Sequence, residues 1–152
     1  MKRLGLMTVV SLLLMGSSRS EDRILVQLIE VDSQSAVCGC SFRESIPGAV
    51  EGGYCSGPEL LIVAPNAEPP HALVNLGRGN LKLSPVKPIE FPMFHCEVGE
   101  RFVSEWKSET LRVLAKLSVV GSGDEACWFQ GTVLATVEPK SSEVPVKGAC
   151  GC

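Results

Sequence analysis

Two Cys-Gly-Cys triplets are the strongest chemical signal in this chain of 152 residues, and they occupy residues 38–40 and 150–152. Residues two apart on a strand share one face, so each triplet would present two sulfurs on the same side. Seven cysteines form at most three bridges, and the sequence leaves the pairing open. A cysteine left over could join two copies into a disulfide-linked homodimer. The disulfide candidates are Cys38, Cys40, Cys55, Cys96, Cys127, Cys150 and Cys152.

A soft-metal site is the alternative use of these sulfurs. Four thiolates from two Cys-x-Cys pairs suffice for tetrahedral zinc or for a Cu(I) cluster. The secretion signal at residues 1–20, described below, would place the cysteines in an oxidising compartment. That compartment opposes metal binding, because thiolates must stay reduced to bind a metal. We therefore expect no cofactor, with copper or zinc as the alternative. The metal candidates are Cys38, Cys40, Met93, His95, Cys96, Cys150 and Cys152.

A third interpretation treats one triplet as an exchangeable dithiol. The usual exchange motif is Cys-x-x-Cys at the start of a helix, where the dipole lowers the thiol pKa. The residues around both triplets are typical of strands instead. Separate structural disulfides are therefore the preferred interpretation, and each would stabilise the fold by about 2–4 kcal/mol.

Catalytic side chains in a familiar arrangement are missing from the sequence. A serine or cysteine nucleophile needs a base, and the chain has only two histidines, His71 and His95. Neither falls in a Gly-x-Ser-x-Gly or His-Glu-x-x-His motif. We expect a protein that is not an enzyme.

Residues 1–20 have the three parts of a secretion signal. Lys2 and Arg3 precede an apolar run over residues 4–15, and small polar residues follow up to Ser20. A run of twelve residues is shorter than the roughly 20 that a bilayer requires, so we expect no stable membrane insertion. Ser18 and Ser20 are small residues two apart, so the expected cleavage is after Ser20, with cleavage after Ser18 as the alternative. The predicted location is secreted or periplasmic.

The charge balance bears on the partner. The whole chain has a formal net charge of −3, and residues 1–20 contain three basic residues and no acidic ones, so the mature chain would carry −6. Nucleic acids and anionic membranes attract clustered lysine and arginine, which this sequence lacks. A protein partner with a basic surface suits the negative charge better.

Short alternating segments separated by turn residues indicate an all-β fold. The expected strands are residues 24–31, 36–42, 60–64, 72–76, 81–86, 101–107, 111–119 and 127–137. Residues 77–80, Gly-Arg-Gly-Asn, have the composition and spacing of a hairpin turn. Residues 65–70 contain three prolines and are expected to form a loop.

These segments predict one domain over residues 21–138, stapled by disulfides. Seven or eight short strands favour either a small barrel resembling the OB (oligonucleotide/oligosaccharide-binding) architecture or a sandwich of antiparallel strands. Residues 139–152 are expected to be an extended C-terminal tail that carries the last Cys-Gly-Cys back to the body.

These expectations combine into a functional hypothesis. An exported, disulfide-stapled domain without catalytic groups is best explained as a protein-binding module, such as an inhibitor or accessory protein of a bacterial envelope. Its basic partner could be a lysozyme-like hydrolase. The candidate contact residues are Glu68, Arg78 and Trp106, the last because it lies in a polar stretch.

Overall fold

The structure is a computed structural model that describes residues 23–29, 39–46, 58–88, 91 and 95–151. Eight antiparallel strands pair in sequence order, and the last pairs with the first to close a barrel. The disulfide-stapled all-β fold expected from the sequence is confirmed, and of the two architectures expected, barrel or sandwich, the structure has the barrel. The strands are β1 (Gly39–Glu44), β2 (Glu59–Ala64), β3 (His71–Asn75), β4 (Asn80–Pro85), β5 (Arg101–Lys107), β6 (Arg112–Ser122), β7 (Ala126–Val137) and β8 (Lys140–Gly151).

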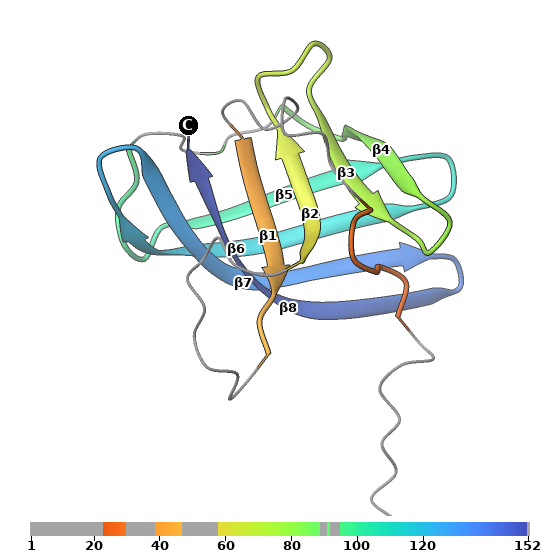
Figure 1. The fold of residues 1–152 in the computed structure, drawn as a ribbon. Coiled ribbons are helices and arrows are strands. Elements are labelled where there is room, and N and C mark those ends of the chain that lie inside the picture. The colour runs from red at the N-terminus through yellow and green to blue at the C-terminus, as the bar shows by residue number, and fades with distance from the viewer. Residues whose placement is uncertain (1–22, 30–38, 47–57, 89–90, 92–94, 152) are drawn as a thin grey trace, which may run out of the picture.

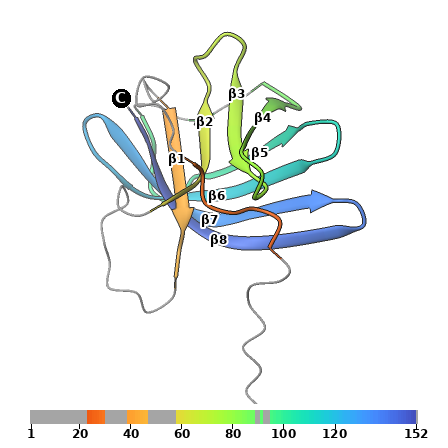
Figure 2. The same cartoon turned by 45° about the vertical axis from the view of Figure 1, so that its right-hand side comes forward.

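The short strands β1 to β3 cross over the long strands β6 to β8 (Figure 1), and a 45° turn shows the same crossing (Figure 2). Alternate residues of each strand point inward, because successive side chains leave opposite faces of a strand. The inward residues fill the barrel with apolar side chains. Its aromatic centre is made of Phe42, Phe91, Phe102, Trp106 and Phe129.

Strand β8 corrects the expectation of a C-terminal tail. Residues 140–151 pair with β7 along their whole length and with β1 from Val146 to Gly151. Pro145 is tolerated in β8 because it lies opposite Ser45, one residue past the end of β1 at Glu44. The Pro145 carbonyl accepts the amide of Ser45, so the missing N–H would point to the same side, beyond the last residue of β1. The proline therefore removes no hydrogen bond from the ladder between β1 and β8.

Glycine allows β1 and β8 to approach closely. A Cβ atom on Gly148 would lie 2.2 Å from the carbonyl oxygen of Ser41 and 2.5 Å from Cδ1 of Phe42. Any side chain at residue 148 would thus push β8 away from β1, at the seam that closes the barrel.

Residues 23–29 form an N-terminal strap across one end of the barrel and are not the strand that was predicted; residues 30 and 31 of the predicted range 24–31 lie outside the described residues. Only Val26 makes a β-bridge, to Asn75 at the end of β3. Leu25 and Leu28, three residues apart, are buried, whereas Ile29 is exposed. The prediction failed because an apolar run was read as a strand buried on both faces, although a segment that covers the barrel end also buries apolar side chains.

Hydrogen bonds fix the strap to five strands, β1, β2, β3, β4 and β8. The Leu28 amide donates to the carbonyl of Glu59, and the Ile24 amide donates to Oγ of Ser142. Arg23 forms two hydrogen bonds with the Glu44 carboxylate at 2.6 and 2.7 Å, and these bonds together with the charge attraction raise the pKa of the guanidinium. All these strand residues lie at or near one end of the barrel, which we call the strap end.

Asn75 is the polar anchor of the strap end. It is buried, its amide donates to the Gln27 carbonyl at 2.7 Å, and its Oδ1 accepts the amides of Gly77 and Gly79. We expect Asn75→Ala to lower the free energy of unfolding by about 2–3 kcal/mol, because each bond contributes about 1 kcal/mol. Urea unfolding measures this loss.

Asn80→Ala is the matched control for this prediction. Asn80 also holds the strap through two hydrogen bonds, both with the backbone of Ile29, but its side chain is exposed. Water can replace those bonds, so we expect a loss of at most about 1 kcal/mol. Equal losses in the two variants would show that burial of Asn75 does not set its contribution.

Candidate functional site

Four cysteines gather at the barrel end opposite the strap, which we call the disulfide end. Cys40 on β1 is bonded to Cys150 on β8, and Cys96 is bonded to Cys127 on β7. Cys40 and Cys150 face each other across β1 and β8, and Cys150 and Cys127 face each other across β8 and β7. Three cysteine side chains thus form one row on the inner surface of the barrel.

These bonds test part of the cysteine predictions. Cys40, Cys96, Cys127 and Cys150 are structural cysteines, and the bond from Cys40 to Cys150 ties the end of the chain to the barrel. Cys38, Cys55 and Cys152 lie outside the described residues, so their pairing stays a prediction. The presence of two disulfides indicates an oxidising, extracellular or periplasmic environment.

The candidate metal ligands are not assembled in the described part of the chain. Cys40, Cys96 and Cys150 are held in disulfides and are not thiolates. His95 is exposed, and Met93 lies outside the described residues together with Cys38 and Cys152. No group of three or more potential metal ligands occurs among the residues that the structure describes.

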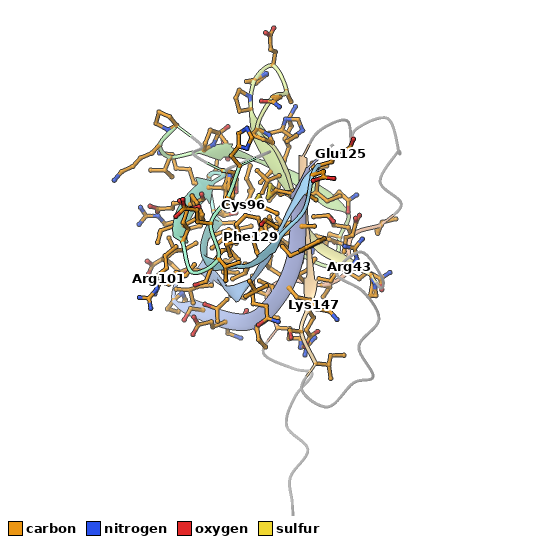
Figure 3. All side chains as sticks on the ribbon, turned by 90° about the vertical axis from the view of Figure 1, so that its left-hand side faces the viewer. Arg43, Cys96, Arg101, Glu125, Phe129 and Lys147 are labelled. Atoms are coloured by element: carbon orange, nitrogen blue, oxygen red, sulfur yellow. A yellow bond between two sulfur atoms is a disulfide. The ribbon has the colours of Figure 1, made fainter. Side chains whose placement is uncertain are left out.

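Two turns are joined by the disulfide between Cys96 and Cys127. Residues 97–100 follow Cys96 directly and lead into β5, while residues 123–125 connect β6 to β7 just before Cys127. We call residues 97–100 and 123–125 the clamped turns. Cys96 and Phe129 lie between Arg101 on one side and Glu125 on the other when the molecule is viewed from this end (Figure 3).

Hydrogen bonds reinforce the disulfide in the first of the clamped turns. The Glu97 amide donates to Oε2 of Glu100 at 2.9 Å, and the Glu100 amide donates to the Glu97 carbonyl at 3.1 Å. Gly99 has a φ of 96°, which favours glycine, and its amide donates to the Val119 carbonyl at the end of β6. This turn is therefore fixed both to itself and to the barrel.

The second of the clamped turns closes the hairpin between β6 and β7. The Gly123 amide donates to the Ala126 carbonyl at 2.8 Å. A Cβ atom on Gly121 would lie 2.6 Å from Cε3 of Trp128, so the indole packs directly against the backbone at the end of β6. Both clamped turns are thus held by hydrogen bonds to residues of the barrel strands.

The clamped turns expose an apolar side chain among carboxylates. Val98 is 69% exposed, the largest value among the exposed apolar side chains that the structure describes. Glu97 and Glu100 flank it, and Asp124 and Glu125 of the other turn are exposed as well. This surface therefore combines an apolar contact with up to four negative charges.

The predicted contact residues do not form one surface. Glu68 lies in the loop between β2 and β3, and Arg78 lies in the turn between β3 and β4. Both are exposed. They sit at opposite ends of the five-residue strand β3, which spans about 15 Å. A single small contact cannot be centred on both.

Trp106 was wrongly expected to be an exposed contact residue. Its side chain is completely buried, and its ring stacks on Phe91 with a centroid distance of 6.2 Å. Trp128 alternates with the inward Cys127 and Phe129 and is only partly buried. The alternation of inward and outward residues along β5 and β7 determines the burial of both tryptophans. The polarity of the neighbouring residues does not predict it.

The two histidines lie apart from the clamped turns or at their edge. Nδ1 of His71, at the start of β3, is 3.0 Å from the Pro69 carbonyl oxygen. His95 precedes Cys96 and is exposed. That neither histidine is catalytic, and that His95 is a ligand in the alternative metal site, stay predictions from the sequence.

The glutamates at residues 97, 100 and 105 lie on two elements, a turn that the local sequence pattern did not predict and a strand that it did. Glu97 and Glu100 belong to the first of the clamped turns, whereas Glu105 is on β5 and pairs with Arg112 of β6 at 2.9 Å. The missed signal was Val-Gly between the first two glutamates, because glycine permits the positive φ that a tight turn requires.

Among the described residues, no helix is long and apolar enough to cross a membrane. Comparison with protein-family models, with curated proteins and with solved structures found no match to this chain.

Proposed function

We propose that this protein is an exported, non-catalytic binding protein that recognises another protein through the clamped turns. The observation that carries the proposal is Val98, an apolar side chain held in solvent by a turn that a disulfide and hydrogen bonds keep rigid. A turn that is already fixed loses little backbone entropy on binding, so more of the contact energy of its exposed apolar side chain is available for affinity.

The charges around Val98 favour a partner with a basic surface. Glu97, Glu100, Asp124 and Glu125 are all exposed at the clamped turns. A net charge of −6 after loss of residues 1–20 would add long-range attraction and speed the encounter with a basic protein. A lysozyme-like hydrolase of a bacterial envelope is a partner of this kind, and it would make this protein an inhibitor or accessory protein.

Export rests on two observations of different kinds. The sequence has a positively charged start, an apolar run and small residues before Ser20, in the order of a secretion signal. The structure has two disulfides, which persist in oxidising compartments. Together they support a secreted or periplasmic protein.

The proposal predicts that Val98→Lys weakens binding to purified animal lysozyme by at least tenfold. The change removes the apolar contact and places a positive charge opposite a basic partner. Titration by calorimetry at about 50 mM and 200 mM salt measures the dissociation constant, and the activity of the lysozyme reports inhibition. Binding by the unmodified protein should weaken as the salt concentration rises.

Val103→Lys is the matched control. Val103 is 68% exposed, almost the same as Val98, but it lies on the outer face of β5 opposite Lys116. This variant gains the same charge outside the clamped turns and should bind within threefold of the unmodified protein. Lysozyme binding that responds equally to both changes would move the contact away from the clamped turns, and no binding at either salt concentration would reject lysozyme as the partner.

A further inference from the structure

The register of the disulfide end places one cysteine beside a bridge to which it does not belong. Cys127 and Cys150 are direct partners across the antiparallel strands β7 and β8, and both side chains are buried on the inner surface. Direct partners have Cα atoms about 4.5–5.5 Å apart, which falls within the range of about 4.4–6.8 Å that a disulfide requires. Cys127 is thus positioned to bond either Cys96 or Cys150.

The same register excludes the other exchange. Cys40 is separated from Cys127 by the full width of β8, because β1, β8 and β7 are consecutive strands. Two strand spacings amount to about 9–10 Å, beyond the reach of a disulfide. A nucleophile at Cys127 can therefore attack Cys150 directly and Cys40 only after movement of the backbone.

Access to the four bonded cysteines is uneven. Cys40, Cys127 and Cys150 are buried, and only Cys96 is partly exposed at the entry to the clamped turns. Thiol–disulfide exchange begins with attack by a thiolate on an accessible sulfur. Cys96 is consequently the point at which a thiol from solution can reach this group.

We propose that Cys96 is a site of thiol attack from which disulfide exchange passes into the barrel. An external dithiol attacks Sγ of Cys96, the bond to Cys127 breaks, and Cys127 leaves as a thiolate. The Cys127 thiolate attacks Sγ of Cys150, a new bond forms between them, and Cys40 leaves as a thiolate that takes up a proton. The second thiol of the dithiol then releases Cys96 and becomes a disulfide.

The exchange consumes one external dithiol and leaves two protein thiols, Cys40 and Cys96, with one bridge in place of two. It also releases residues 97–100 from residues 123–125, because the bond that joins the clamped turns is lost. The inference concerns the cysteine row alone and does not depend on the proposed partner.

Two single variants that break the same bond test the exchange without any reductant. Cys96→Ser leaves the Cys127 thiol beside Cys150, whereas Cys127→Ser leaves the Cys96 thiol at the surface and removes the internal nucleophile. Each purified, oxidised variant is alkylated with iodoacetamide and mapped by peptide mass spectrometry. We expect label on Cys40 in at least one tenth of the Cys96→Ser molecules and in almost none of the Cys127→Ser molecules.

Label confined to Cys127 in the Cys96→Ser variant, or equal labelling of Cys40 in both variants, would overturn the proposal. A measurement on the unmodified protein decides the matter if a variant fails to fold. Its free thiols are blocked with N-ethylmaleimide, limiting dithiothreitol is added, and new thiols are alkylated with iodoacetamide. Early label on Cys96 and Cys40 together supports the exchange, and early label on Cys96 and Cys127 with the Cys40–Cys150 bond intact contradicts it.

Discussion

Replacing both Cys40 and Cys150 by alanine should lower the free energy of unfolding by about 4.8 kcal/mol, more than the loss of the other described disulfide. The bond joins residues 110 apart and ties the last strand to the first, so its loss frees almost the whole described chain in the unfolded state. A loss of this size should lower the midpoint of thermal unfolding by about 10–18 °C. Scanning calorimetry without reductant measures it.

The Cys96→Ala/Cys127→Ala pair is the control for loop length. Its bond spans 31 residues, so the same entropy model gives a smaller loss of about 3.5–4 kcal/mol. After full reduction, the free energy of unfolding of each double variant should nearly equal that of the unmodified protein, because all three chains then lack both disulfides. A difference that persists in excess reductant would show that packing of the sulfurs, and not the cross-link, stabilises the barrel.

The fold was predictable where strand alternation and turn chemistry agree. Residues 101–107 were predicted as a strand and form β5 with the same bounds, and Gly77 and Gly79 have the positive φ that a hairpin turn at residues 77–80 requires. Strand β8 was missed because Pro145, Gly148 and several polar residues weaken the local pattern. Its place is fixed by pairing with β7 and β1, which no local pattern records.

The candidate site was harder to predict than the fold. The disulfide from Cys96 to Cys127 brings together turns that are more than twenty residues apart in sequence, and seven cysteines allow too many pairings to foresee it. Val98 could not be predicted as a contact residue, because a single valine between acidic residues has no distinctive sequence pattern. Its significance comes from exposure on a rigid turn, a property of the folded chain.

The alternation of β5 turns the side chain of Trp106 into the barrel. The ring is completely buried, and its Nε1 has no hydrogen-bond partner among the described residues. We expect Trp106→Ala to lower the free energy of unfolding by about 3–5 kcal/mol, because the change leaves a large cavity against Phe91. Urea unfolding followed by circular dichroism measures the loss.

Trp106→Phe separates the ring from its N–H group. Phenylalanine fills less of the space than tryptophan but keeps much of the aromatic packing. It also removes the buried N–H group, and a buried donor without a partner destabilises the folded state by about 1–3 kcal/mol. The two effects oppose each other, so we expect this variant to remain within about 1 kcal/mol of the unmodified protein. A loss as large as that of Trp106→Ala would mean that Nε1 is satisfied in solution, for example by a buried water molecule. Because the ring lies inside the barrel, Trp106→Phe should also leave lysozyme binding unchanged, whereas Val98→Lys should not.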